Sequence, residues 1–493
     1  MLFDAVATHA RRSPQALACV DLTTGQHWNY QQLDQAINQL AHFFVQQLGA
    51  ASAERVAVVG RNSAAILIVN LACIRAGAIF VPCNWRLSPV EVNALLDDAE
   101  PALLLTDAEF HFPNSQAQQF LLADASVLGA EFSVDAPTGA RRPVEDTALL
   151  LYTSGTSGRP KGVMLSELNT LWSQIAFNTG NGVSDKSVFL CDMPMFHTAG
   201  LLVNTRAPLL AGGSVYISAG FDADKTLARL SDAALGITHY FSVPQMAKML
   251  WEHPQFNSEK MQSLEVYATG GAPNPKAQIE RFVQAGIRIS DGFGMTEAGS
   301  VSGMPVDDGN VAIQKAGSAG TLFFSIEARI VNAAGEDLPC GEAGELWLSG
   351  PGITAGYWRQ EVATADAFRD GWFMTGDIAM LDEEGFLFLL DRKKDMFISG
   401  GENVYPAEVE AVIVEQDDIA EAAVLGVPDE QWGEKGVAFI VPVMGREISL
   451  EKIKTYCLTN LAAYKVPKDF IVRTDLPRTS TGKIQKQLLQ LDL

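Results

Sequence analysis

The stretch Tyr152-Thr-Ser-Gly-Thr-Ser-Gly-Arg-Pro-Lys-Gly162 follows directly on a short apolar run at 148–152. Hydroxyl side chains and glycines fill positions 153–158, and Lys161 adds a compact positive charge. Glycine lets backbone N–H groups approach an anion closely, and the hydroxyls add hydrogen-bond donors. The spacing is not that of the Walker phosphate loop, and a Gly/Ser linker is the alternative interpretation. A strand, a donor-rich loop and a lysine in this order favour a polyphosphate site.

Short apolar runs alternate with helical patterns on both sides of this loop. Alternation of this kind is typical of an α/β fold. The runs expected to be buried strands lie at 56–59, 79–82, 103–106, 188–190, 215–217, 237–241 and 264–268. The expected helices lie at 31–49, 64–76, 222–234, 244–253 and 275–285.

The pattern changes after about residue 310. In the stretch 316–390, glycines and β-type runs at 328–331, 345–348 and 386–390 predict a twisted β unit. The charged cluster 391–395 is the candidate linker, and the remainder has a β-α-β-β-α pattern. We therefore predict an α/β protein: a large N-terminal domain, 1–390, of stacked α/β subdomains plus a β unit, a hinge at 391–395, and a small α+β domain at 396–493.

Composition limits the class of protein. The chain has 493 residues, 47% of them apolar and 19% charged, with a net charge of −22. That balance excludes a disordered chain, and it disfavours binding to nucleic-acid backbones or anionic lipid. No apolar run approaches the ~20 residues that span a membrane, and the N-terminus lacks the order of a signal peptide. The six scattered cysteines are expected to be reduced core thiols of a cytoplasmic protein.

Two further loops carry carboxylates. In Asp291-Gly-Phe-Gly-Met-Thr-Glu297, a carboxylate beside a Gly/Thr turn can hold Mg²⁺, and the aromatic ring can stack on a purine. In Phe373-Met-Thr-Gly-Asp377, the aspartate can accept two ribose hydroxyls. Taken alone, a surface turn explains either segment at least as well.

Two more segments carry possible cations or bases. His197, in Pro194-Met-Phe-His-Thr-Ala-Gly200, lies among apolar residues, where a packed imidazole is commoner than a general base. Lys483 ends the Gly/Thr segment Pro477-Arg-Thr-Ser-Thr-Gly-Lys483. By itself, a solvated terminal lysine is the simpler interpretation.

Together and in this order, the segments resemble the adenylate-forming superfamily of acyl-CoA synthetases, nonribosomal peptide adenylation domains and firefly luciferases. The resemblance spans about residues 10–487 and is closest to fatty-acyl or aryl CoA ligases. It depends on YTSGTSGRPKGV, GFGMTE, TGD, DRKKDMFISGGENVYPAEVE and PRTSTGK. It implies a mobile C-terminal domain and two steps: a carboxylate attacks the α-phosphate of ATP and releases pyrophosphate, and a thiol then displaces AMP.

The resemblance also implies roles for individual residues. Catalytic roles fall on Lys161, Thr296, Glu297 and Lys483, with Glu297 as the Mg²⁺ ligand. ATP contacts fall on Thr153, Ser154, Gly155, Thr156, Ser157, Gly158, Gly271, Ala272, Pro273, Asp291, Gly292, Phe293, Gly294, Asp377 and Arg392, although many relatives have an amide in place of Asp291. Lys394 falls at the hinge, and the tunnel for coenzyme A falls on His197, Gly400 and Gly401.

The acyl pocket is expected at His197, Val203, Ser242, Val243, Thr269, Met295 and Val301. Amino-acid-activating relatives keep an aspartate in the segment corresponding to 196–200, and here that segment has no acid. Burying an ammonium group without a partner costs free energy. The substrate is therefore expected to be a carboxylic acid without an amino group, either a fatty or an aryl acid.

The acceptor is expected to be coenzyme A, since no carrier domain follows Lys483. Six bases against two acids between Lys465 and Lys486 are consistent with its phosphates, and equally with a solvated face. A free-standing acyl carrier protein is the rival acceptor. An inactive nucleotide-binding regulator and a luciferase-like oxygenase are the alternatives from other classes, and Lys161, Glu297, Asp377 and Lys483 argue against the regulator.

Overall fold

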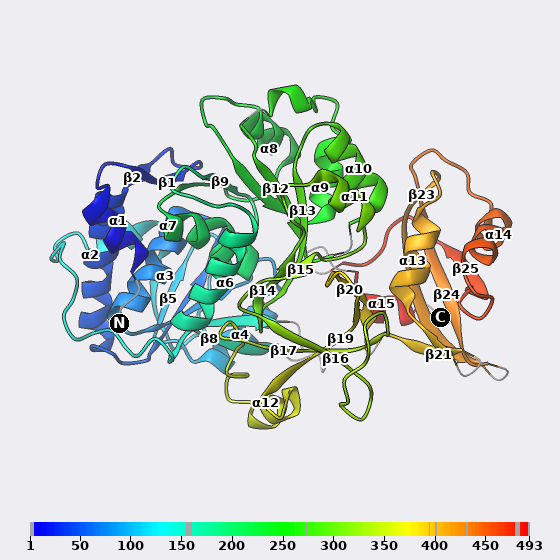
Figure 1. Cartoon of the computed structure of the whole chain (residues 1–493). Helices are drawn as coiled ribbons and strands as arrows, with labels where there is room; N and C mark the ends of the chain where they lie inside the picture. The colour runs from blue at the N-terminus through cyan, green and yellow to red at the C-terminus, as the bar shows by residue number, and fades with distance from the viewer. Residues whose placement is uncertain are drawn as a thin grey trace. The chain divides into compact units, whose positions relative to one another are not determined.

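The computed structural model describes residues 4–153, 160–261, 263–272, 274–393, 395–399, 402–429, 432–478 and 484–491. The chain divides into two compact units, Met1–Glu327 with Leu348–Phe373, and Ala328–Trp347 with Met374–Leu493 (Figure 1). The β unit expected at 316–390 is thus divided between them. The predicted hinge at 391–395 falls inside the second unit, and its mobility stays a prediction.

One sheet of the first unit has the strand order β15-β14-β13-β12-β11-β9-β10-β1-β2. Pairing from β1 through β13 is parallel, whereas β2, β14 and β15 are antiparallel additions at the edges. The bounds are β1 Leu17–Asp21, β2 His27–Asn29, β9 Val188–Cys191, β10 Ser214–Ile217, β11 His239–Ser242, β12 Val266–Gly270, β13 Ile289–Met295, β14 Gly299–Gly303 and β15 Thr321–Leu322.

The other sheet of this unit has the order β6-β5-β3-β4-β7-β8 and is parallel except for the hairpin of β7 and β8. Its strands are β3 Arg55–Val59, β4 Ile79–Cys83, β5 Leu103–Thr106, β6 Gln118–Leu121, β7 Thr147–Thr153 and β8 Lys161–Ser166. The hydrophobic core joins both sheets, with Val56 and Phe80 in one cluster with Phe189 and Val215. The predicted α/β class is confirmed.

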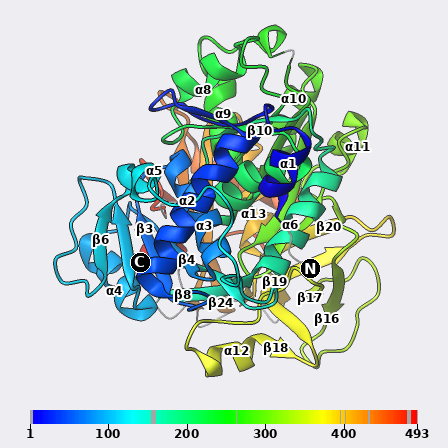
Figure 2. The same ribbon diagram turned by 90° about the vertical axis from the view of Figure 1, so that its left-hand side faces the viewer.

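Several helices of the first unit follow the apolar periodicity and begin at side-chain caps. Asn29 and Gln32 form a capping box on α2, and Ser88 and Glu91 form one on α4. α3 is mostly apolar and almost entirely buried, and it packs beside α2 in the core (Figure 2). The bounds are α1 Ala5–Arg12, α2 Tyr30–Leu48, α3 Ala64–Ala76, α4 Pro89–Ala99, α5 Ala125–Leu128, α6 Glu167–Gly180, α7 Ala207–Ala211, α8 Ala223–Leu230, α9 Pro244–Trp251, α10 Lys276–Gln284, α11 Gly309–Gln314 and α12 Glu361–Ala367.

Two sequence expectations need correction. The helix expected at 222–234 ends at Leu230, because the Asp232 side chain accepts a hydrogen bond from the N–H of Ala234 and so favours a turn. Cys340 is exposed and is not a core thiol, while the other cysteines are buried. No helix in the described part of the chain is long and apolar enough to cross a membrane.

The second unit holds β20 Leu387–Arg392 and most of β16 Glu327–Val331, β17 Gly344–Ser349 and β19 Trp372–Leu381. The first residues of β19 pair with β18 Phe368–Arg369, and both belong to the first unit. Its other sheet has the order β22-β21-β24-β23, with β25 on β24. The bounds are β21 Phe397–Ser399, β22 Glu402–Val404, α13 Pro406–Val414, β23 Ile419–Asp429, β24 Gly433–Pro442, α14 Leu450–Asn460, β25 Asp469–Val472 and α15 Lys486–Gln490. The predicted β-α-β-β-α order corresponds to β21, α13, β23, β24 and α14.

Candidate active site

The donor-rich loop connects the two strands of an antiparallel hairpin. Thr153 ends β7 and lies opposite Lys161, the first residue of β8. The Lys161 ammonium lies 4.8 Å from the ring centroid of Tyr357, within the range of a cation–π contact. The hairpin therefore fixes the lysine at the base of the loop. The predicted phosphate contacts of the loop itself, at 154–158, lie outside the described residues.

A second hairpin carries the Gly-Phe-Gly-Met-Thr-Glu segment. Residues 291–295 belong to β13, and Thr296 and Glu297 form the turn into β14. Gly299 has φ +68°, and a Cβ there would lie 2.5 Å from the side chain of Ser173 on α6. The Ser173 hydroxyl accepts a 3.0 Å hydrogen bond from the N–H of Ser300. This close approach needs glycine, and it seats the Glu297 turn on α6.

Glu297 is held by a segment that the sequence analysis did not identify. The Tyr357 hydroxyl donates a 3.2 Å hydrogen bond to Oε1 of Glu297, and the N–H of Thr354 donates to its carbonyl at 2.7 Å. The same segment pairs with β8, since the N–H of Trp358 donates to the carbonyl of Gly162 at 2.7 Å. Tyr357 thus joins the predicted metal ligand to Lys161. Its sequence context gave no signal, because nothing in a Gly-Tyr-Trp run indicates a partner 60 residues away.

The Glu297 carboxylate, oriented by the Tyr357 hydroxyl, is chemically suited to binding Mg²⁺. This ion is usually bound through one or two carboxylates together with substrate phosphates, and it keeps several waters. Among the residues that the structure describes, no group of three or more His, Cys, Asp or Glu could form a complete protein cage for a metal. Glu297 would therefore hold Mg²⁺ jointly with a polyphosphate.

The predicted nucleotide and acyl residues meet at the carboxyl ends of parallel strands, where open α/β sheets bind ligands. Ser242 of β11, Thr269 of β12 and Asp291 of β13 are neighbours in register. Gly271 follows β12 with φ +83°, and among the described residues a Cβ there would have only Val243 within 4 Å. The side of Gly271 where a Cβ would lie is thus free of close contacts with the described residues.

Asp291 is a buried carboxyl group whose pKa is raised. The Thr269 hydroxyl donates to its Oδ1 at 2.8 Å and accepts from the Asn274 amide at 3.1 Å, and Gln278 donates to Asn274 at 3.0 Å. Burial raises the pKa of Asp291 to about 7, against the hydrogen bonds from Thr269 and Gly292, which lower it. Asn274 and Gln278 were not predicted, since their role depends on helix α10 packing beneath β12.

The predicted acyl-pocket residues come from several elements. Val203, on the π-helix η2 Ala199–Arg206, and Val301 of β14 are buried, Met295 ends β13, and His197 precedes η2. The Ser242 hydroxyl lies 2.9 Å from the Tyr267 hydroxyl. Their contacts with a substrate stay predictions, as does the tunnel role of His197.

In the second unit, Asp377 and Arg392 form an ion pair. They lie opposite each other on β19 and β20, with Nε of Arg392 2.8 Å from Oδ1 of Asp377. The Asp377 side chain is 8% exposed and the Arg392 side chain 42%. The structure thus brings together two residues of the predicted ribose clamp. Pro273, Lys394, Gly400, Gly401 and Lys483 lie outside the described residues, and their roles stay predictions.

These features define the class of protein as an adenylate-forming enzyme: parallel strands carrying nucleotide-site residues, a hydroxyl-rich hairpin with a lysine, and a carboxylate suited to Mg²⁺. Family models match the chain as AMP-binding enzyme over residues 6–358 and as AMP-binding enzyme C-terminal domain over 408–483. The chain belongs to the AMP-binding enzyme family.

The similarity of the chain to known proteins supports this family assignment. A feruloyl-CoA synthase of Amycolatopsis is 37% identical over 97% of this chain and 96% of its own length, and the indoleacetate–CoA ligase of Aromatoleum aromaticum is 36% identical over 93% and 92%. ATP-bound MatB from Rhodopseudomonas palustris superposes with a TM-score of 0.90 at 30% identity, covering 99% of this chain and 98% of that one. The o-succinylbenzoate coenzyme A synthetase of Bacillus subtilis, solved with ATP and magnesium, superposes with a TM-score of 0.87 at 28% identity, covering 99% of both chains.

The chain is an AMP-forming acyl-CoA synthetase, which confirms the function predicted from the motifs.

Proposed function

We propose that this enzyme activates an aromatic carboxylic acid without an amino group and transfers the acyl group to coenzyme A. The observation that carries the proposal is the satisfied polar network at the ends of β11–β13. The Ser242 and Thr269 hydroxyls are bonded to Tyr267 and Asp291, and burial favours the neutral form of Asp291. No described carboxylate at these strand ends is therefore free to pair with an α-ammonium group.

An aryl acid is favoured over a fatty acid on two grounds. The relatives named above act, by their names, on feruloyl, indoleacetate and succinylbenzoate groups. In this chain the Phe241 ring lies 3.3 Å from where a Cβ of Gly270 would be, and it packs edge-on against Phe177. Phe241 thus places an aromatic ring beside the end of β12, and an aromatic substrate can pack on such a ring with more specific geometry than a long flexible chain.

The residues supply positioning and charge neutralisation, which displacement at phosphorus chiefly requires. Lys161 and the 153–158 loop would bind the polyphosphate, and Glu297, oriented by Tyr357, would hold Mg²⁺. Mg²⁺ neutralises charge on the departing pyrophosphate when it is bound. Lys483 would neutralise the approach of carboxylate to α-phosphate, and Asp377 with Arg392 would bind the ribose.

Coenzyme A is the proposed acceptor, but the basic stretch 465–486 supports it less than its composition suggested. Lys465 pairs with Glu408 at 2.6 Å, Arg478 with Glu421 at 2.7 Å, and Lys486 with Glu410 at 2.8 Å. Much of this positive charge is therefore neutralised within the second unit. The proposal depends instead on the relatives, which are CoA ligases by name. We place the enzyme in the cytoplasm, together with its substrates ATP and CoA.

The test is pyrophosphate release with Mg·ATP over aryl, fatty and amino acids, with and without CoA. We expect aryl acids to give a kcat/KM at least about tenfold above fatty acids, a difference that pocket shape can supply. We also expect a thioester to form only with CoA. A preference for fatty or amino acids would contradict the substrate proposal, and release that is indifferent to CoA would favour a carrier-protein acceptor.

A further inference from the structure

A cavity of about 60 Å³ lies in the first unit, away from the residues assigned to the reaction. It is bordered by the segment before α1 and by α3, α6, η2 and α7, with apolar side chains such as Leu71, Leu171 and Leu209 on its walls. The volume has room for roughly four water-sized groups, taking ~10–15 Å³ for each. The charged lining residues are Asp4, Arg75, Arg141, Glu167 and Arg206.

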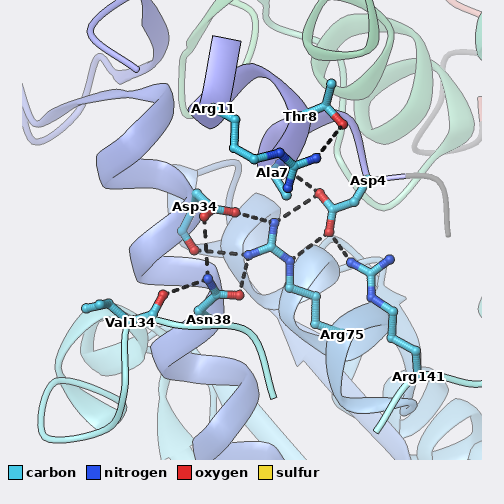
Figure 3. Close-up of polar contacts among 9 residues, drawn as sticks. All are labelled: Asp4, Ala7, Thr8, Arg11, Asp34, Asn38, Arg75, Val134 and Arg141. Atoms are coloured by element: carbon cyan, nitrogen blue, oxygen red, sulfur yellow. Dashed lines mark hydrogen bonds and ion pairs between the residues drawn. The ribbon is translucent and has the colours of Figure 1, made fainter. Parts of the chain in front are cut away.

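One of these arginines is fully engaged. Both Asp4 oxygens accept hydrogen bonds from Arg75, at 2.9 and 3.0 Å (Figure 3). The remaining N–H groups of Arg75 point to the carbonyl of Asp34 at 3.0 Å, its carboxylate at 2.7 Å, and the Asn38 amide oxygen at 2.6 Å. Arg75 therefore has no donor left for a ligand.

The other charged groups have unused bonding capacity. Arg141 donates to Asp4 through Nη2 (Figure 3). Its Nη1 is buried and has no hydrogen-bond partner among the residues that the structure describes. Arg206 has one long contact, 3.4 Å to the Thr170 hydroxyl. Glu167 is 8% exposed, and its carboxylate makes no hydrogen bond or ion pair with any residue that the structure describes. Glu167 is buried, and Arg141 and Arg206 are partly buried. Charged groups in such places normally have partners, so two guanidinium groups with unused donors and one carboxyl face a space that can hold a ligand.

The charge balance indicates what fills it. Three carboxylates, Asp4, Asp34 and Glu167, accompany three guanidinium groups. Burial raises the pKa of Glu167, while Arg141 and Arg206 lower it and Asp4 raises it further. Burial lowers the pKa of Arg206 to about 10, so this arginine keeps its charge at neutral pH. Once Glu167 is protonated, one positive charge is in excess beside donors with no partner. A guanidinium presents its N–H groups in a plane that matches a planar oxyanion.

We propose that this cavity binds a small planar oxyanion of the carboxylate or nitrate type, held by Arg141 and Arg206 and taken up together with a proton on Glu167. The groups that face Glu167 come from each surrounding element: Asp4 before α1, Arg141 from the loop before β7, and Arg206 from η2. Arg75 on α3 completes the charged wall but is saturated. The site is distinct from the acyl and nucleotide residues and does not depend on the proposed substrate.

The test is anion binding to the full chain, using sodium formate and sodium nitrate against sodium chloride at equal ionic strength. At pH 6 we expect formate and nitrate to raise the midpoint of thermal unfolding above that in chloride, and at pH 8 we expect a smaller rise. Calorimetry in buffers of different ionisation enthalpy should show close to one proton taken up per anion. A response to nitrate alone would identify an inorganic anion, and a response to formate the carboxylate class; either supports the site.

Variants make the test specific. Arg206→Gln and Arg141→Gln should each weaken binding at least about tenfold, because a charge-assisted hydrogen bond is lost. Glu167→Gln should bind at pH 6 and pH 8 alike. Arg142→Gln is the matched control, since Arg142 pairs with Asp146 and does not line the cavity. Equal responses to chloride and nitrate, or unchanged binding in both arginine variants, would overturn the proposal.

Discussion

At the scale of single residues, Tyr357 and Asp291 show how the surroundings change what a side chain does. Tyr357 is 9% exposed, with its hydroxyl on Glu297 and the Lys161 ammonium near its ring. It orients the carboxylate that would bind Mg²⁺ without needing to touch the substrate. Asp291 lies in a buried network in which its neutral form is favoured.

Tyr357→Phe tests the orienting role. Removing the hydroxyl leaves Glu297 without its side-chain donor, so the concentration of Mg²⁺ needed for half-maximal activity should rise by about tenfold, with a smaller change in kcat. Tyr216→Phe is the matched control, because the Tyr216 hydroxyl makes no hydrogen bond in the described structure. An unchanged Mg²⁺ titration in Tyr357→Phe would show that the contact has no functional part.

Asp291→Asn tests the raised pKa. A carboxyl whose pKa is about 7 in the folded state and near 3.8 when unfolded contributes stability that is complete below about pH 4. That stability is lost as pH rises through 7, and the change is about 4 kcal/mol at 1.36 kcal/mol per pH unit. The variant should lose this pH dependence and be more stable than the wild type at pH 8. Urea midpoints at pH 5 and pH 8 measure it.

The control for this prediction is Asp135→Asn, which changes an exposed aspartate. The amide keeps an oxygen that can accept from Thr269, so activity with ATP should be retained. If the wild type and Asp291→Asn showed parallel pH profiles, Asp291 would be ionised throughout the range.

At the scale of elements, α6 connects several parts of the first unit. Glu167 at its start lines the anion cavity, the Asn169 amide donates to the carbonyl of Ile353 at 2.8 Å, and Ser173 supports the turn that carries Glu297. Ser166 and Asn169 form its capping box. The helix therefore positions the Tyr357 segment and the Glu297 turn together.

Gly299→Ala tests this packing. The new methyl would lie 2.5 Å from Ser173 in a left-handed conformation, so the turn must move away from α6. We expect kcat/KM to fall at least about tenfold, the scale on which small misplacements of catalytic groups act. Gly371→Ala is the control, since φ there is +83° with open space around the Cβ position. Equal losses in both variants would mean that backbone strain, and not contact with α6, is responsible.

At the scale of the whole molecule, the predicted catalytic residues are divided between two units. The predicted catalytic residues Lys161 and Glu297 fall in the first unit and Lys483 in the range of the second, which also holds the predicted ribose-binding pair Asp377 and Arg392. The family matches cover both parts, at 6–358 and 408–483. The reaction has two steps, so a residue of the second unit can serve one step and not the other.

Lys483→Ala tests that division. We predict that adenylate formation falls by about 10²–10³-fold, since a preorganised charge partner is lost. Thioester formation from a supplied acyl-adenylate should be nearly unchanged, because the mixed anhydride is already activated. Pyrophosphate exchange and CoA consumption measure the two steps separately, with Lys468→Ala as a control for loss of charge. Equal losses in the two steps would contradict the assigned role.

The sequence alone determined the features that depend on neighbours along the chain. Alternating apolar runs and helical patterns predicted the α/β class, and glycine and hydroxyl residues marked the loop before Lys161 and the turn that carries Glu297. These properties follow from backbone freedom and local burial, which a short window of sequence contains. The order of the motifs then identified the family.

Only the tertiary structure decided which distant residues meet. The pairing of Tyr357 with Glu297, the support of Asp291 by Asn274 through Thr269, and the cavity between Asp4, Arg141 and Arg206 join separate segments. Such contacts arise from the order of strands in a sheet and from the packing of helices on it. Periodicity and composition do not encode that choice, because one local pattern is compatible with many strand orders.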